Sequence, residues 1–145
     1  MSELKPQNLK NHAAFDPWFH IVLSLVLVIN LAVATGHLIR HFGLHSVWLE
    51  VLSLAVFVLA AKVRMYSIKV QDRVIRLEER LRLRDLAPAE SPELIARLNE
   101  GQLIGLRFAS DEEVVALAHQ AVAEKLDRKQ IKERIKNWRA DYWRV

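Results

Sequence analysis

The stretch IVLSLVLVINLAVATGHLI, from Ile21 to Ile39, determines the fold of this 145-residue chain. None of its residues is Lys, Arg, Asp or Glu. The apolar core of a bilayer is about 30 Å thick, and a helix needs about 20 residues to cross it. Trp18 precedes the stretch as an interfacial anchor, and Asp16 followed by Pro17 is typical of a helix start. We therefore expect a membrane-spanning helix over about residues 17–39.

A second apolar stretch follows after a short loop. It extends from Val47 to Ala61 and contains one acidic residue, Glu50. Lys62 lies at its end, where long basic side chains reach the membrane interface. With its flanking residues the stretch predicts a second span over about residues 47–66. Residues 17–66 are thus expected to form a transmembrane hairpin.

Two other interpretations fit parts of this pattern. Two apolar helices also occur as a buried hairpin in soluble proteins, although the rest of this chain offers little apolar surface to cover them. The N-terminal part also resembles a cleaved signal peptide, with Lys5 and Lys10 before the apolar run and Ala32–Ala34 as the cleavage site. The run is long for a signal peptide and continues past that site, which favours a retained span.

Basic residues near the ends of the spans predict the orientation. The N-terminal tail, residues 1–16, contains Lys5 and Lys10, and Arg40 is the only Lys or Arg in the loop between the spans. Several basic residues follow the second span, beginning with Lys62. Because basic residues are enriched on the cytoplasmic side, we expect both termini in the cytoplasm and the loop outside.

The second span is expected to continue as one helix into the cytoplasm. Residues 46–87 contain neither Gly nor Pro, and residues 67–87 are mostly strong helix formers. The pairs Asp72–Arg76 and Glu78–Arg82 favour an exposed helix surface. Two explanations remain open for the heptad-spaced apolar row of this helix: self-association, or packing onto the C-terminal helices. The row consists of Val63, Val70, Val74, Leu77 and Leu81.

Pro88 ends this long helix, and residues 88–145 are expected to form three to four short cytoplasmic helices. Ser110 with Glu113 predicts a capping box, and Asp127 predicts the start of the last helix. The expected fold is therefore all-α, with a transmembrane hairpin whose second helix extends into a helical region. A further apolar stripe predicts that the last helix continues close to the chain end: Ile131, Ile135, Trp138 and Tyr142.

The C-terminal region is strongly basic, with eight Lys or Arg against three Asp or Glu over residues 125–145. One explanation is a solvated surface on a helix whose stripe packs inward. Another is a helix that binds anionic lipid headgroups or a partner protein, and nucleic-acid binding is the weaker third. The candidate binding residues are Lys132, Lys136, Trp138, Arg139 and Tyr142.

Polar residues inside the spans are the first candidates for chemistry, because burying them in lipid is costly. Asn30 lies near the middle of the first span, with Ser24 closer to its start, and Glu50 lies one turn inside the second. Such side chains form hydrogen bonds between helices or line a pore in an oligomer. We expect Asn30, Ser24 and Glu50 to serve one of these roles.

His37 and His41 are four residues apart and share a face if the helix continues, which makes them weak candidates for a metal. His20 and His37 are too far apart on one helix to hold a haem together. The absence of cysteine excludes disulfides and thiolate chemistry. No phosphate-binding glycine loop and no ordered catalytic set is present. We expect no cofactor, no small-molecule substrate and no enzymatic activity.

Four segments carry a resemblance that covers nearly the whole chain: QNLKNHAAF, KVQDRVIRLEERLRL, LRFASDEEV and IKNWRADYWRV. Together they resemble an uncharacterised family of small bacterial two-span membrane proteins, a domain of unknown function. The resemblance implies a bacterial inner-membrane protein and supplies no activity or site. The leading hypothesis is a non-enzymatic membrane scaffold or accessory subunit that associates with itself, with partner proteins or with headgroups. The alternatives are a homo-oligomeric channel or transporter lined by the first span, and a membrane-tethered nucleic-acid binder.

Overall fold

The computed structural model describes residues 6–11 and 15–141, which form helices joined by short connections. Four short helices follow two long ones, so the predicted all-α fold is confirmed over the described residues. The described chain divides into two compact units. The first contains residues 15–69, and the second contains residues 6–11 and 70–141.

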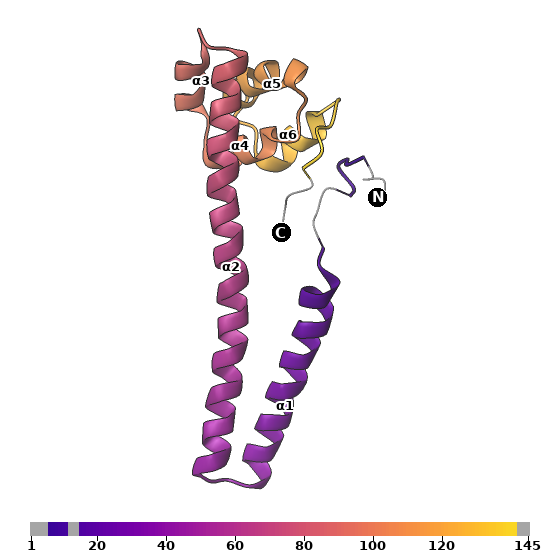
Figure 1. Cartoon of the computed structure of the whole chain (residues 1–145), viewed down its shortest axis with the longest axis vertical. Coiled ribbons are helices and arrows are strands. Elements are labelled where there is room, and N and C mark those ends of the chain that lie inside the picture. The colour runs from indigo at the N-terminus through magenta and orange to yellow at the C-terminus, as the bar shows by residue number, and fades with distance from the viewer. Residues whose placement is uncertain (1–5, 12–14, 142–145) are drawn as a thin grey trace. The chain divides into compact units, whose positions relative to one another are not determined.

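The first unit is a helical hairpin (Figure 1). A π-helical segment, η1 (Trp18–Leu23), leads into α1 (Ser24–Arg40), and a short loop connects α1 to the antiparallel α2 (Leu44–Leu86). The Asp16 carboxylate accepts a hydrogen bond from the backbone N of Trp18 at 3.0 Å. The predicted helix start is therefore confirmed, because this contact satisfies one of the free donors of the first turn.

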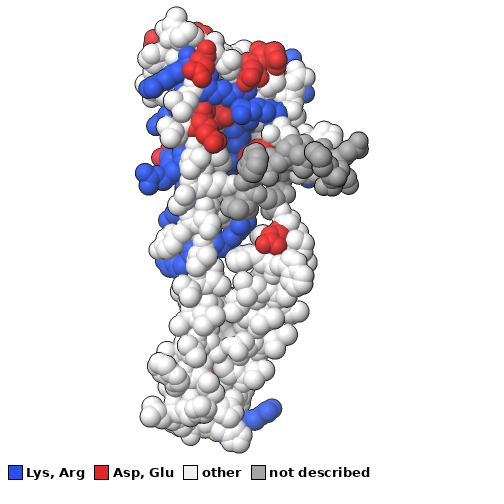
Figure 2. Space-filling view, viewed as in Figure 1, with Lys and Arg blue, Asp and Glu red and all other residues white. Residues whose placement is uncertain are grey.

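Both long helices are apolar and long enough to cross a membrane. Only 6% of the most apolar window of each helix is buried, whereas the core helix of a soluble protein is mostly buried. Figure 2 shows an almost uncharged surface on the hairpin and many acidic and basic side chains on the second unit. The interpretation as a buried hairpin of a soluble protein therefore does not fit the described residues.

The second unit has a small apolar core around one helix. Here α4 (Glu100–Leu106) packs against α5 (Asp111–Ala123) and α6 (Arg128–Arg134), and α3 (Ser91–Arg97) packs against α5. Nearly every side chain of α4 is buried, because other helices cover it on several sides. The largest fully buried side chains of this core are Leu83, Leu103, Leu106, Phe108, Val114 and Ile131.

Two capping boxes fix the starts of the short helices. The Asn99 side chain accepts from the backbone N of Gln102, and the Gln102 side chain accepts from the backbone N of Asn99, both at 2.9 Å. Asp127 and Gln130 form the same reciprocal pair at the start of α6, which confirms the predicted start at Asp127. Helices this short depend on such caps, because each end leaves several backbone groups unpaired.

The last helix is shorter than predicted. It ends at Arg134, where Ile135 adopts extended backbone, so the predicted stripe from Ile131 through Trp138 does not lie on one helix. The chain instead returns beside the α4–α5 connection, where Arg139 N donates to Phe108 O at 2.7 Å. Tyr142, the last member of that stripe, lies outside the described residues.

The predicted capping box of Ser110 and Glu113 is also absent. Ser110 is the N-cap residue of α5, but its side chain makes no cap hydrogen bond. The Glu113 carboxylate instead accepts from the backbone N of Asn137 at 3.0 Å and of Lys136 at 3.2 Å. Glu113 therefore holds the returning segment, because a carboxylate bound by two amides satisfies more of that exposed backbone than a local cap would.

Candidate interaction site

The second half of α2 presents an exposed apolar row, here called the α2 seam and defined as Val70, Val74, Leu77 and Leu81. These four side chains are between 48% and 62% exposed. Val63, the first residue of the predicted row, belongs to the first unit and is 54% exposed. Exposed apolar residues are ordinary when scattered, but a contiguous row at heptad spacing is typical of an interaction surface.

The opposite face of α2 packs onto the short helices. Ile75, Glu79 and Leu83 lie on this face and are at most 5% exposed. Successive helical residues are rotated by about 100°, so positions two apart point in nearly opposite directions. The C-terminal helices therefore occupy the face opposite the α2 seam, and the explanation in which they cover the seam is wrong for the described residues.

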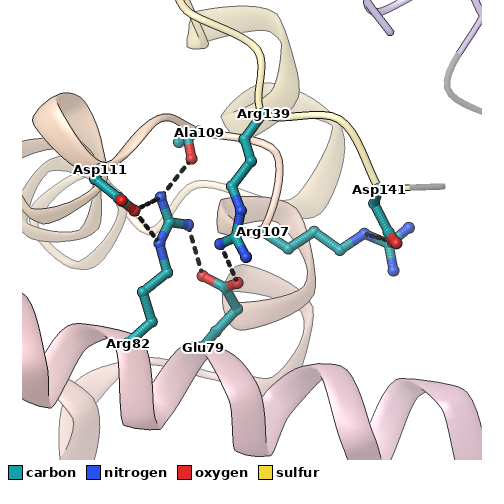
Figure 3. A network of polar contacts seen from close by, with 7 residues as sticks. All are labelled: Glu79, Arg82, Arg107, Ala109, Asp111, Arg139 and Asp141. Atoms are coloured by element: carbon teal, nitrogen blue, oxygen red, sulfur yellow. Dashed lines mark hydrogen bonds and ion pairs between the residues drawn. The ribbon is translucent and has the colours of Figure 1, made fainter. Parts of the chain in front are cut away.

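A network of charged groups joins this packed face to the rest of the second unit (Figure 3). Glu79 Oε2 lies 3.1 Å from Arg82 Nη1, and Glu79 Oε1 lies 3.6 Å from Arg139 Nη1. Arg82 also donates to Asp111 Oδ1 at 2.6 Å and to the backbone O of Ala109 at 2.7 Å. Arg82 thereby connects α2 to the start of α5.

Burial raises the pKa of Glu79, and the nearby guanidinium groups of Arg82 and Arg139 oppose that rise. A buried carboxylate needs such cations, because an unpaired charge in this environment is strongly destabilising. Beside this cluster, Arg107 Nε lies 3.4 Å from Asp141 Oδ2, and its guanidinium lies 4.3 Å from the centre of the Phe108 ring. The contacts of Glu79 and Arg82 thus hold α2 against the rest of the second unit, and those of Arg107 join the end of α4 to the returning C-terminal segment.

The predicted surface pairs on α2 do not form. Arg82 pairs with Glu79 and Asp111 instead of Glu78. Arg76 pairs with Glu100 on α4, and its only contact with Asp72 is a hydrogen bond to the backbone carbonyl at 3.2 Å. Pairing by sequence spacing failed here because partners on other helices reach the same guanidinium groups.

Charged residues flank the α2 seam on both sides. Arg73 and Arg80 follow one edge, and Glu78 and Asp85 follow the other. All four side chains are exposed, and none of them takes part in the ion pairs found among the described residues. The seam is therefore an apolar strip with a basic edge and an acidic edge.

The predicted headgroup-binding residues are largely engaged within the second unit. The ammonium group of Lys132 lies 5.2 Å from the centre of the Phe108 ring, and the Trp138 ring packs against the same ring in a tilted arrangement at 5.2 Å between centroids. Arg139 contacts Glu79, as described above. Lys136 has an exposed side chain, and Tyr142 lies outside the described residues.

The polar candidates of the spans are not brought together. Ser24 donates to the backbone O of Phe19 at 3.2 Å, and the Asn30 side chain is exposed. Glu50 accepts a hydrogen bond from Thr35 Oγ1 at 3.0 Å, which links α1 to α2. Sequence reasoning missed this pair, although Thr35 and Glu50 lie almost symmetrically about the loop, and residues so placed face each other in a hairpin.

His37 and His41 do share a face, with ring centroids 5.1 Å apart. The described residues contain no group of three or more His, Asp or Glu side chains that could hold a metal ion together. The histidine pair therefore remains a two-residue arrangement at the loop end of α1.

Comparison with known protein families gives a match for this chain. A family model described as a family of unknown function, DUF6526, matches residues 1–145. The chain belongs to the DUF6526 family. No curated protein and no solved structure matches it. The resemblance to a family of unknown function is thus confirmed.

Among the surfaces of the DUF6526 protein, the α2 seam has the best-defined geometry. Its four apolar side chains are fixed on one face of a continuous helix, because the opposite face is anchored in the core of the second unit. The other candidate residues are either paired internally or isolated. The seam is therefore the candidate functional site.

Proposed function

We propose that this protein is a non-enzymatic scaffold or accessory subunit of the bacterial inner membrane, and that it acts through association along the α2 seam. The hairpin would anchor the chain, with both termini in the cytoplasm. The single observation that carries the proposal is the row of exposed Val70, Val74, Leu77 and Leu81 on a helix whose other face is already packed. Apolar rows of this spacing bind other helices by burying their side chains.

Two features support the proposed topology. Basic residues are more numerous before the first span and after the second than in the loop, where Arg40 is the only Lys or Arg. In addition, Gln7 and Asp141 form reciprocal hydrogen bonds: Gln7 Nε2 donates to Asp141 O at 3.0 Å, and Asp141 N donates to Gln7 Oε1 at 2.8 Å. Residues that bond in this way have to lie on the same side of a membrane, as two crossings require.

Affinity purification of the full chain from native membranes, followed by mass spectrometry, tests the association. We expect the wild-type chain to bring down one defined partner or its own copies, and Leu77→Asn to lose at least about nine-tenths of that material. Leu86→Asn is the matched control, because Leu86 is an exposed leucine of α2 outside the seam. Equal recovery with both variants would contradict association through the seam.

Topology and processing have their own tests. A periplasm-active reporter fused after Val145 should stay inactive, and a cytoplasm-active reporter at the same place should be active. The intact mass of the purified chain should be 16.7 kDa, as expected when the first span is retained. A mass reduced by the first 30 to 35 residues would favour the signal-peptide interpretation.

One observation favours a second candidate, a homo-oligomeric channel or transporter. Asn30 lies within the apolar part of α1 and is exposed, so its amide has to face lipid or another chain if α1 spans the membrane. Ion flux through liposomes containing the wild-type protein, abolished by Asn30→Leu, is the result expected of a pore. Flux that persists in Asn30→Leu, or no flux at all, would reject that candidate.

Headgroup and nucleic-acid binding are weaker proposals for the same chain. Lys132, Trp138 and Arg139 have contacts within the second unit, and the Lys136 side chain is exposed. Titration of the full chain in uncharged nanodiscs with DNA, and separately with anionic vesicles, at two salt concentrations separates these proposals. Salt-dependent binding of DNA alone would favour the nucleic-acid binder.

A further inference from the structure

We propose that the surface covering the α2 seam is the α2 seam of a second copy of this chain, parallel to the first and in register. This inference rests on the proposed function of the seam as an association surface and names its partner. Three observations carry it: the heptad positions of the seam residues, the charges at its two edges, and the rigid attachment of the helix.

The seam residues fit the two core positions of a heptad. With Val74 and Leu81 at position a, Val70 and Leu77 fall at position d. In a two-stranded coiled coil these residues insert between those of the other helix. The structure leaves this strip accessible along the whole stretch, since all four side chains are about half exposed or more.

The edge charges then fall at the positions that determine partner choice. Arg73 and Arg80 occupy position g, and Glu78 and Asp85 occupy position e. In a parallel dimer, a g residue lies beside the e residue that is five positions further along the other helix. Arg73 therefore meets Glu78 of the second copy, and Arg80 meets Asp85 of the second copy.

The same charges disfavour the antiparallel arrangement. In antiparallel coiled coils g residues lie beside g residues and e residues beside e residues, which would place arginine against arginine and acid against acid. Such like-charge contacts destabilise a pairing. The edge charges thus favour a parallel, in-register second copy over an antiparallel one.

These four groups are available for pairing between chains. The internal network uses other arginines of α2, namely Arg76 and Arg82, which pair with Glu100, Glu79 and Asp111. No ion pair among the described residues involves Arg73, Arg80, Glu78 or Asp85. The charged groups along the seam are thus different residues from those of the internal network.

The seam is short, about two heptads, and a short coiled coil of free peptides is weak. Two features of this chain offset that weakness. The helix is already ordered, because Ile75 and Leu83 fix its other face in the core, so association costs little ordering. Copies anchored in one membrane with the same orientation also present their helices parallel and at one depth, which raises their effective concentration.

Disulfide cross-linking in native membranes tests the arrangement, because the chain contains no cysteine. We expect the single variants Val70→Cys and Leu81→Cys each to form a covalent dimer with itself on mild oxidation. Leu86→Cys, an exposed position of α2 away from the seam, should form at least about fivefold less and reports chance collisions. An antiparallel pair would instead bring residue 70 of one chain to residue 81 of the other, with little self-cross-linking at either position.

Charge exchange tests the proposed pairs. Arg73→Glu combined with Arg80→Glu makes both edges acidic and should lower the yield of the Val70→Cys dimer roughly tenfold. Adding Glu78→Arg and Asp85→Arg restores opposite charges at every parallel contact and should restore the yield. If the first pair of substitutions leaves the yield unchanged, the assigned edge contacts are wrong.

The outcomes separate this inference from the proposed function. If Leu77→Asn loses a captured protein while neither Val70→Cys nor Leu81→Cys cross-links to itself, the seam binds a different protein; the proposed function then stands and the second copy is overturned. If Leu77→Asn changes nothing and no cross-link forms, both are overturned. Self-cross-linking at both positions, with loss and recovery on charge exchange, supports the parallel second copy.

Discussion

Leu77 and Glu79 lie two positions apart on α2 in reversed environments: the leucine is 59% exposed and the glutamate is 3% exposed. Helical rotation of about 200° between the two positions places them on opposite faces. The carboxylate is held inside by Arg82 and Arg139, while the leucine belongs to the α2 seam. The two faces of the helix therefore serve different purposes, and substitutions on them should have different effects.

The two faces of α2 can be compared with one substitution type. Leu83→Ala should lower the free energy of unfolding by about 2–5 kcal/mol, because Leu83 is fully buried and its loss leaves a cavity. Leu77→Ala should change it by less than about 0.5 kcal/mol, because Leu77 is exposed. Thermal unfolding in detergent, at a dilution where the chains are monomeric, measures both. Equal losses would show that the two faces are wrongly assigned.

Glu79 should make stability depend on pH. Its pKa is raised in the folded chain, so the folded state holds this proton more tightly than the unfolded state. The resulting stabilisation is complete below the unfolded pKa of about 4.5 and is lost as pH rises through the folded pKa. Wild type should therefore lose stability relative to Glu79→Gln as pH rises from about 4 to 8. Glu78→Gln, at the exposed neighbouring position, should not reproduce this change, and a pH-independent difference for Glu79→Gln would contradict it.

Arg82 should be the most sensitive arginine of α2. Arg82→Ala removes the contacts with Glu79, Asp111 and the Ala109 carbonyl together and leaves Glu79 buried with less compensation. A loss of about 3–5 kcal/mol is expected for breaking a buried ion pair from one side. Arg84→Ala, at an exposed position of the same helix, should cost less than about 0.5 kcal/mol. Urea or thermal unfolding of the two variants in one detergent distinguishes them.

Gly105 permits the close packing of α4 on α6. A Cβ at this position would lie 3.2 Å from Ile131 Cγ2 and 3.4 Å from the backbone O of Arg128. Gly105→Val should therefore cost about 1–3 kcal/mol through overpacking. Gly36→Ala is the control, because a Cβ there meets nothing within 4 Å, and it should be neutral or slightly stabilising in a helix. Similar melting temperatures for wild type and Gly105→Val would contradict the close contact.

Thr35 should contribute modestly to the hairpin. Thr35→Val removes the hydroxyl that bonds Glu50 and should destabilise the hairpin by about 0.6–2 kcal/mol, the usual range for such bonds in membranes. Thr35→Ser keeps the hydroxyl and should retain most of that stability. Steric-trap or detergent-unfolding measurements compare the two. A Thr35→Ser variant as unstable as Thr35→Val would contradict the prediction, because it would show that the retained hydroxyl does not preserve the stability.

Sequence reasoning predicted the features that depend on composition and regular spacing. The apolar runs predicted two long helices, and heptad spacing found all the residues of the exposed row on α2. Local signals also succeeded where a side chain caps its own helix, as at Asp127. In each case the determining contacts lie within a few residues of one another or repeat regularly.

The errors in the predicted capping box and ion pairs have one physical cause, which is that the charged side chains bind groups far along the chain. Glu113 holds the backbone of Lys136 and Asn137 instead of capping its helix, and Arg82 reaches Asp111 instead of Glu78. Whether the row on α2 faces its own chain or another was equally undetermined, because that depends on which face the core takes. The buried position of Glu79 shows that the core lies on the opposite face, and no pattern in the sequence distinguishes Glu79 from its exposed neighbour Glu78.

The hydrogen bonds between Gln7 and Asp141 can form only late in the synthesis of the chain. The two residues are 134 positions apart, and ribosomes add about 5–20 residues per second, so roughly 7–30 s separate their synthesis. Throughout that interval Gln7 lacks the group it bonds in the finished chain. Both apolar helices are synthesised within the same interval, which makes the bonding of Gln7 to Asp141 a late event in biogenesis. A chain whose translation stops just before Asp141 would contain both helices of the hairpin but would lack the residue that Gln7 bonds.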